Sequence, residues 1–196
     1  MKTLLIVDPQ LDFMPRGNLA VEDGHQILSH INLLQPQYDL VLATQDWHPC
    51  NHMSFAVNHE GYKPFDVKVI DGYPQTLWPE HCLQGSGGAE FHPDLSTHQI
   101  EAIFRKGTDP KIDSYSAFYD NRHQKSTGLS GFLKEKGCQS LDVCGLAGDI
   151  CVYFTIKDAL KEGFEVRLLE QATRSLDLDR FQQQKTELQA EGVVFI

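Results

Sequence analysis

Four ionisable side chains lie just after apolar runs of strand length, and they are the first candidates for chemistry. Asp8 follows the first run, Asp46 the second and Lys106 the third, while Cys151 follows the fourth after a turn at 145–150. In an open parallel sheet, ligands bind beyond the carboxyl ends of the strands, so these side chains would meet at one edge. Each alone has an ordinary interpretation as a cap, a solvated charge or a packed thiol. Their shared placement favours a catalytic cluster.

Cys151 is the candidate nucleophile of this cluster. A strand, a turn containing glycine and a helix in sequence would place its sulfur at the N-terminus of the helix. Backbone amides there stabilise a thiolate, and the ammonium of Lys106 would lower the pKa of the thiol further. Asp8 would then act as general base, first for the thiol proton and later for a water.

The remaining four cysteines, Cys50, Cys82, Cys138 and Cys144, lack this placement. The five cysteines of the chain are scattered and contain no CxxC pair. Such a set argues against both a disulfide framework and a thiolate zinc site. We therefore expect reduced thiols, with Cys138 and Cys144 as packing residues.

A second group of residues has the chemistry of a metal site. Asp46 and His48 are separated by one residue, so in an extended segment both side chains point the same way and can meet one ion. A third imidazole from another loop would complete the set, and we expect His81 in that place, with His52 as the alternative. Two histidines and one carboxylate suit zinc, iron or manganese, with water in the remaining positions.

Strands and helices that alternate along the chain must position these residues. The apolar runs are continuous rather than alternating, which is typical of strands buried on both faces of a parallel sheet. The pattern predicts an α/β fold of three layers, with a doubly wound, mainly parallel sheet and helices on both faces. The predicted strands are 4–7, 40–44, 102–104, 141–144, 166–169 and 193–196, and the predicted helices are 26–34, 150–162 and 178–190.

We expect residues 1–196 to form one domain in which the segment at about 46–91 binds substrate and metal. This segment is rich in proline, glycine, histidine and aromatic residues and has little regular period. Irregular stretches of that length in a compact domain usually carry binding loops.

The composition excludes several classes of protein. Of the 196 residues, 41% are apolar and 22% are charged, which is typical of a globular domain, and no apolar stretch is long enough to span a membrane. The net charge of −10 comes without a basic cluster, so we expect neither nucleic acid nor anionic membrane as a partner. No GxGxxG motif follows the first strand, which argues against dinucleotide binding. The first apolar run meets Asp8 and Pro9 too early for a signal peptide, so we expect a cytoplasmic protein acting on a small, neutral substrate.

Five blocks of sequence, in order and spanning nearly the whole chain, resemble the nicotinamidases among the isochorismatase-like cysteine hydrolases. Each block alone would be weak evidence, but together they are specific. They are DPQLDF at 8–13, DWHP with HMSF at 46–55, WPEHC with QG at 78–85, KG with DSYSAF at 106–118, and GLAGDICV at 145–152.

This resemblance implies a reaction and a set of roles. Asp8, Lys106 and Cys151 would form the catalytic triad, and the chain would convert nicotinamide to nicotinic acid and ammonia through a thioester, as in NAD salvage. A divalent metal held by Asp46, His48 and His81, with zinc as the expected ion and iron or manganese as alternatives, would bind the pyridine nitrogen. The residues implied at the pyridine ring are Phe13 and Trp78, which would sandwich it, and Tyr115, which would line the same pocket.

The resemblance also implies a particular turn before the nucleophile. A cis peptide bond between Leu146 and Ala147 would aim the amides of Ala147 and Cys151 at the oxyanion. Gly148 departs from the family, which usually has threonine or a larger residue there, and this raises the question of how stiff the turn is.

Three alternatives stay open at the level of sequence. The chain could be a cysteine hydrolase of the same fold that acts on another small amide. It could be a metallohydrolase in which bound water is the nucleophile and Cys151 is incidental. It could also be a metal-dependent binding or regulatory domain without catalysis. The sequence does not decide whether the chain forms a homo-oligomer or whether pyrazinamide is also a substrate.

Overall fold

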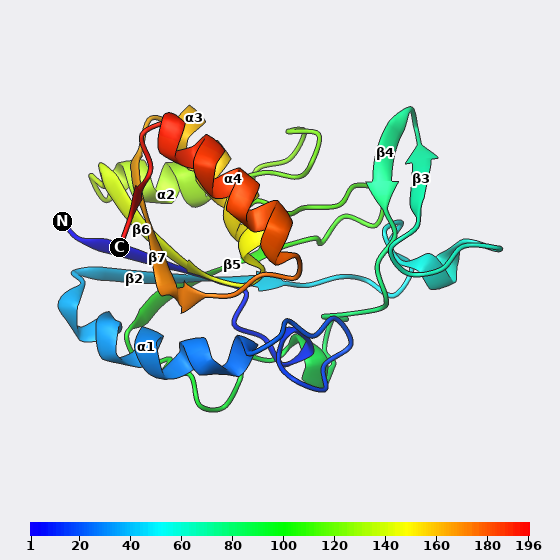
Figure 1. Ribbon diagram of the computed structural model, residues 1–196, viewed down its shortest axis with the longest axis horizontal. Helices are drawn as coiled ribbons and strands as arrows, with labels where there is room; N and C mark the ends of the chain where they lie inside the picture. Colours follow the sequence, from blue (N-terminus) through cyan, green and yellow to red (C-terminus); the bar gives the residue numbers. More distant parts are fainter.

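A six-stranded parallel sheet in the order β5-β2-β1-β6-β7-β8 organises the protein, whose computed structural model describes all 196 residues (Figure 1). Every residue of the interior strands β1 and β2 is buried, which explains their continuous apolar sequences. The strands are β1 (Thr3–Val7), β2 (Leu40–Asp46), β5 (Ile100–Lys106), β6 (Ser140–Gly145), β7 (Glu165–Thr173) and β8 (Val194–Phe195).

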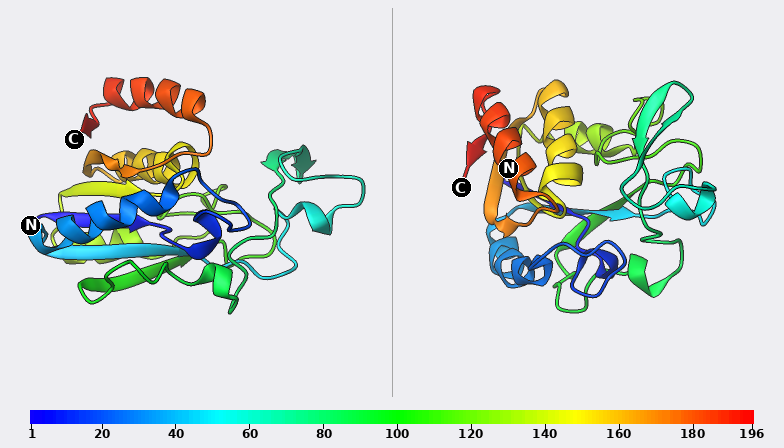
Figure 2. Two further views of the ribbon diagram at one scale, coloured as in Figure 1. Left: turned by 60° about the horizontal axis from the view of Figure 1, so that its bottom comes forward. Right: turned by 45° about the vertical axis from the view of Figure 1, so that its right-hand side comes forward.

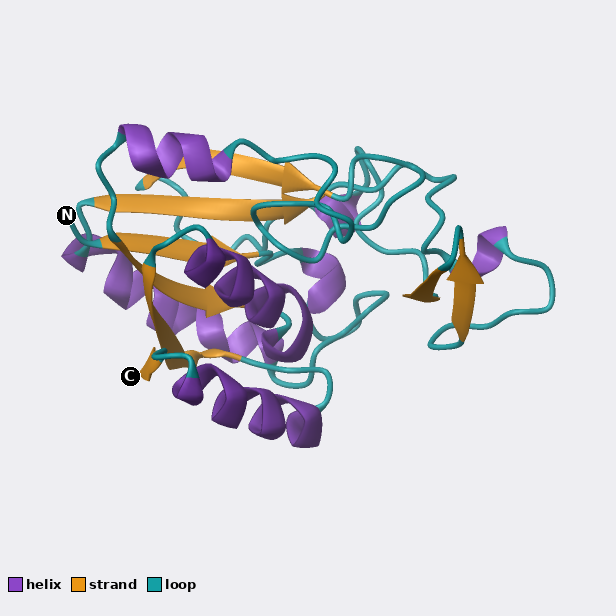
Figure 3. Cartoon of the chain, turned by 90° about the horizontal axis from the view of Figure 1, so that it is seen from above, coloured by secondary structure: helices purple, strands orange, loops and turns teal.

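Helices cover both faces of this sheet and complete three layers. Helix α1 (Ile27–Leu34) lies on one face, and α2 (Leu129–Glu135), α3 (Tyr153–Lys161) and α4 (Leu178–Ala190) lie on the other (Figures 1 and 3). The predicted fold class is thereby confirmed. None of the helices is both long and apolar enough to span a membrane.

Within the main sheet and the helices that cover it, the structure differs from the predicted elements in three places. Helix α2 was not predicted, because a helix of only seven residues shows its apolar spacing twice at most. The helix predicted from residue 150 begins at Tyr153, since a π-helical turn (Gly148–Val152) precedes it. Strand β5 is an edge strand with alternating burial, and Ile103 is 50% exposed, so the expectation of two covered faces is wrong there.

The segment at 46–91 contains a small antiparallel hairpin of β3 (Val67–Ile70) and β4 (Tyr73–Thr76), which the sequence did not predict. The hairpin stands apart from the main sheet, beyond the carboxyl ends of its strands (Figures 2 and 3). The rest of the segment consists of loops and two short 3-10 turns, at Ala56–Asn58 and Gly87–Ala89. The loops of this segment therefore lie at the carboxyl edge of the main sheet, where the candidate residues lie.

Glu162 ties the end of α3 to α2 and the preceding loop. Its carboxylate accepts hydrogen bonds from the Tyr119 hydroxyl at 2.5 Å, the Ser130 hydroxyl at 2.5 Å and the Lys134 ammonium at 2.6 Å. These donors lower the pKa of Glu162 from 4.5 to about 2. Because α3 follows the turn that carries Cys151, Glu162 holds the helix layer behind the site.

We expect Glu162→Gln to lower the free energy of unfolding by about 1–2 kcal/mol at pH 7, since charged hydrogen bonds are replaced by neutral ones. Folding lowers the pKa of this carboxyl, so its contribution is present above the unfolded pKa near 4.5 and is lost as the pH falls toward about 2. Urea unfolding at pH 7 and pH 3 measures the effect. A difference between variant and parent that is as large at pH 3 as at pH 7 would contradict this account.

Candidate active site and metal centre

Lys106 lies at the centre of the residues expected to do chemistry. Its ammonium is 2.8 Å from a carboxylate oxygen of Asp8, 2.5 Å from one of Asp46 and 3.4 Å from the sulfur of Cys151. Ligand atoms of Asp8, Asp46 and Cys151 all lie within 4.8 Å of one another. All four residues are buried. The structure therefore brings the three residues of the expected triad together.

The ends of the central strands position these side chains. Asp8 follows β1 in a left-handed conformation, with φ of 48°, and Thr44 of β2 donates its hydroxyl to the Asp8 carboxylate at 2.6 Å. Gln10 brackets the backbone of Asp46, donating to its carbonyl and accepting from its amide, each at 2.8 Å. Sequence reasoning missed Thr44 and Gln10, although Gln10 lies inside one of the family motifs.

Burial governs the protonation of the cluster. It is the largest influence on Cys151 and raises the pKa of the thiol; Lys106 offsets part of the rise, while Asp8 and Asp46 add to it. Burial likewise raises the pKa of Asp8 against the opposing influence of Lys106. The expectation of a lowered thiol pKa is therefore wrong. Cys151 does lie near the start of a continuous helical stretch, in the π-helical turn that leads into α3, but burial and two nearby carboxylates outweigh the effect of that position.

The turn before Cys151 contains the cis peptide bond expected between Leu146 and Ala147. Ala147 and Cys151 line the same pocket. Asp149, two residues before Cys151, is fully buried. Its carboxylate accepts the backbone amides of Leu176 at 2.8 Å and Asp177 at 3.2 Å and pairs with Arg180 of α4. The nucleophile turn is thus held to α4.

Gly148 does not loosen this turn, because neighbouring residues fill the space beside it. A Cβ atom at position 148 would lie 2.5 Å from the hydroxyl oxygen of Ser175 and 2.9 Å from the ring of Phe181. The amide of Gly148 also donates to the carbonyl of Arg174 at 2.7 Å. In this chain, glycine allows α4 to approach the turn.

We expect Gly148→Ala to push Phe181 and α4 away from the turn, costing about 1–3 kcal/mol of unfolding free energy, as overpacking does. Because the displaced turn carries Cys151, turnover should also fall at least several-fold, since an error of about 1 Å in a reacting group is costly. Thermal unfolding and steady-state kinetics measure the two effects. Gly131→Ala is the control, because a Cβ there meets open space. Equal stability of Gly148→Ala and the parent would contradict the packing argument.

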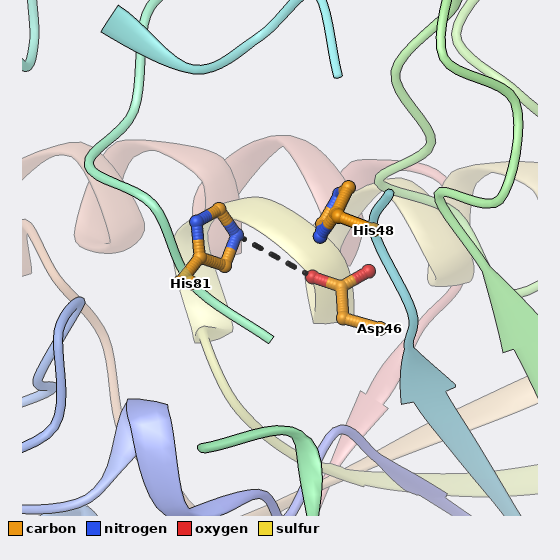
Figure 4. Close-up of side chains that lie close together, drawn as sticks. All are labelled: Asp46, His48 and His81. Carbon is orange, nitrogen blue, oxygen red and sulfur yellow. Dashed lines mark ion pairs between the residues drawn. The ribbon is translucent and has the colours of Figure 1, made fainter. Parts of the chain in front are cut away.

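The expected metal ligands form a compact buried group. Ligand atoms of Asp46, His48 and His81 lie within 4.8 Å of one another, and Nε2 of His81 is 3.7 Å from Oδ2 of Asp46 (Figure 4). His81 donates from Nδ1 to the carbonyl of Pro79 at 2.8 Å, which leaves Nε2 free as a ligand. Both ring nitrogens of His48 are buried without a hydrogen-bond partner. Because such orphaned atoms are costly, the donor set fits a metal ion.

His52, the alternative third ligand, lies in a neighbouring group. Its ligand atom and those of His48 and Asp113 are within 4.8 Å of one another. Nδ1 of His52 is 2.7 Å from the hydroxyl of Ser54. Burial lowers the pKa of His52 to about 4, so its ring is neutral at pH 7. The structure thus places His52 beside, rather than within, the group of Asp46, His48 and His81.

A mostly apolar pocket joins the two groups. The expected ring-binding residues Phe13, Trp78 and Tyr115 all line it, and the Trp78 indole donates to the Tyr115 hydroxyl at 3.3 Å. Sequence reasoning missed four further residues that line the pocket, three of them aliphatic and one acidic. They are Leu19, Asp113, Ile150 and Leu176. The pocket therefore borders both the Cys151 sulfur and two of the candidate metal ligands, Asp46 and His81.

Comparison with known proteins gives a consistent result. The sequence profile of the isochorismatase domain matches residues 2–196. A nicotinamidase of Acinetobacter baylyi is 44% identical over 191 residues, covering 97% of this chain and 89% of the relative. A solved nicotinamidase/pyrazinamidase of Acinetobacter baumanii is 46% identical with a TM-score of 0.96, covering 100% of this chain and 95% of that one. A pyrazinamidase of Pyrococcus horikoshii, solved in complex with zinc, is 33% identical with a TM-score of 0.82, covering 100% and 98%.

Proposed function

Since the chain belongs to the isochorismatase domain family, we propose that it is a cysteine amidohydrolase that converts nicotinamide to nicotinic acid and ammonia, a reaction of NAD salvage. One observation carries the proposal: the buried Cys151–Lys106–Asp8 cluster and the Asp-His-His group meet at one aromatic pocket, which Cys151, Asp46 and His81 line. Residues 1–196 would act as one catalytic domain, with the segment at 46–91 supplying much of the substrate and metal site.

The pocket residues would hold the substrate by its ring. Phe13, Trp78 and Tyr115 offer aromatic surface to the flat pyridine, and the aliphatic side chains beside them exclude water. Asp46, His48 and His81 would hold a divalent ion, with zinc as the proposed metal, and that ion would bind the ring nitrogen and orient the carboxamide toward Cys151.

The first half of the reaction forms a thioester. Asp8 takes the thiol proton as the Cys151 sulfur attacks the carboxamide carbon, and a C–S bond forms. The amides of Ala147 and Cys151 would donate to the oxyanion. The C–N bond then breaks, and ammonia leaves with the proton that Asp8 held. A raised pKa suits Asp8 to this exchange, since it must both accept and return a proton.

The second half releases the acid. Asp8 removes a proton from a water, whose oxygen attacks the thioester carbon. The C–S bond breaks, nicotinic acid leaves, and the proton returns to the sulfur. Throughout, the charged Lys106 stabilises the carboxylates of Asp8 and Asp46.

The test is release of ammonia and nicotinic acid from nicotinamide by purified protein loaded with zinc, iron or manganese in turn. The substrate panel contains pyrazinamide, which keeps a ring nitrogen in place, and benzamide, which has none. We expect nicotinamide turnover, with benzamide a poor substrate. Faster turnover of an amide without a ring nitrogen would favour the alternative of a hydrolase for another small amide. No ammonia from any amide would favour a non-catalytic domain.

A further inference from the structure

Asp113 is a buried carboxylate that the proposed mechanism leaves without a role. It lies in the loop between β5 and α2 and is 2% exposed. Its Oδ1 accepts the backbone amide of Ser114 at 2.8 Å, and its Oδ2 accepts the side-chain amide of Gln75 at 2.9 Å. Oδ1 also lies 3.6 Å from Nε2 of His48. A buried negative charge is thus fixed from two sides and faces the imidazole of a candidate metal ligand.

His48 needs such a group. Neither of its ring nitrogens has a hydrogen-bond partner, and both are buried. If one nitrogen binds an ion, the other carries a proton that needs an acceptor. The rings of His52, Phe55 and His81 contact His48 edge-on, and Asp46 belongs to the ligand group itself. Asp113 is the carboxylate left to accept this proton.

We propose that Asp113 is a positioning residue that accepts the N–H of His48 and so fixes the tautomer and orientation of this ligand, and that Gln75 holds Asp113 in place. Carboxylates commonly play this part behind a metal-bound histidine, and their loss typically weakens metal binding about 10–100-fold. The inference rests on the metal site of the proposed function, but it concerns metal binding and not the amide reaction.

Gln75 extends the arrangement to the hairpin. It is a buried residue of β4, and its side-chain amide also lies 3.3 Å from the hydroxyl of Tyr115 in the substrate pocket. One side chain of the projecting hairpin therefore contacts both the carboxylate behind His48 and a ring of the pocket. The hairpin, which carries none of the expected catalytic residues, thereby supports the metal site.

Metal affinity without substrate tests this proposal, because Asp113 also borders the substrate pocket and its loss would alter KM as well. The zinc dissociation constant is measured by competition with a chromophoric chelator for Asp113→Asn, Gln75→Leu and the double variant. The absorption spectrum of the cobalt(II)-loaded proteins reports ligand geometry. Asp120→Asn is the matched control, since Asp120 is also buried in this loop but accepts only backbone amides.

We expect zinc affinity to fall about 10–100-fold in Asp113→Asn, with a shifted cobalt spectrum, and to stay unchanged in Asp120→Asn. Gln75→Leu should weaken zinc binding less, and it should add nothing in the Asp113→Asn background, because Gln75 acts through Asp113. Unchanged affinity and an unchanged spectrum in Asp113→Asn would overturn the proposal. A loss well above about 10³-fold would also overturn it, by indicating that Asp113 is itself a ligand.

Gln75→Leu keeps the proposal testable if Asp113→Asn fails to fold. It replaces a side chain of the hairpin, outside the main sheet, and circular dichroism establishes whether the variant is folded. A folded Gln75→Leu variant with weaker zinc binding supports the proposal, and one with parental zinc affinity and cobalt spectrum overturns it. Neither result depends on whether nicotinamide is the substrate.

Discussion

Replacing Cys151 with alanine is expected to abolish nicotinamide hydrolysis, with kcat falling on the order of 10⁴-fold or more. The reason is that the sulfur supplies the bond that replaces C–N, while the pocket and the metal ligands only orient the ring. Metal content and unfolding should stay close to those of the parent, because the sulfur is no ligand in the proposed group of Asp46, His48 and His81. Ammonia release, elemental analysis and thermal unfolding check the three statements.

Trapping the intermediate gives this prediction an independent readout. Rapid quenching of the parent with nicotinamide should give a protein heavier by one nicotinoyl group, located on the peptide containing Cys151. Alkylation of the Cys151 thiol is best tested in a Cys50→Ala background, because Cys50 is exposed and would react first. Turnover by Cys151→Ala within tenfold of the parent, without an acyl adduct in the parent, would instead favour a metallohydrolase with water as nucleophile.

The convergence of Asp8, Asp46 and Lys106 could be predicted because it needs little tertiary information. Continuous apolar runs indicate a parallel sheet, and the strands of such a sheet end at a common edge. The order of strands, with β1 between β2 and β6, then brings Cys151 to Asp8. The proximity of Asp46 and His48 could likewise be predicted from their spacing, because alternate side chains of an extended segment point to the same side.

Other properties of the site depend on contacts that no local pattern encodes. The pKa of Cys151 is set by burial and by two carboxylates from distant strands, so local placement near a helix predicted the wrong direction. Gly148 looks flexible in sequence, but Phe181, which lies 33 positions further along, fills its space. Asp113 faces His48 only because the loop after β5 folds back over the site.

Lys106→Met is expected both to inactivate the protein and to destabilise it. The Lys106 side chain is 0% exposed and is the shared partner of Asp8 and Asp46. Its removal leaves Asp8 and Asp46 without a counter-charge, so each must stay ionised in a buried site or take up a proton, which costs about 3–5 kcal/mol of unfolding free energy. Activity should fall at least about 10³-fold, because Asp8 would retain its proton and could no longer serve as a base. Urea unfolding and ammonia release measure these effects.

The pH dependence of the loss of stability in Lys106→Met identifies the cause of that loss. Without Lys106, the pKa of Asp8, already raised by burial, rises further, so ionised Asp8 destabilises the fold at high pH and protonation relieves this strain as the pH falls. The stability gap between Lys106→Met and the parent should therefore narrow from pH 8 to pH 5. Lys136→Met is the control: the Lys136 side chain is 41% exposed and pairs with Glu101 at the surface, so the substitution should cost at most about 1 kcal/mol at either pH. A stability gap that stays constant with pH would mean that lost packing, rather than uncompensated charge, destabilises Lys106→Met. It would also mean that Asp8 and Asp46 are not both ionised in the parent.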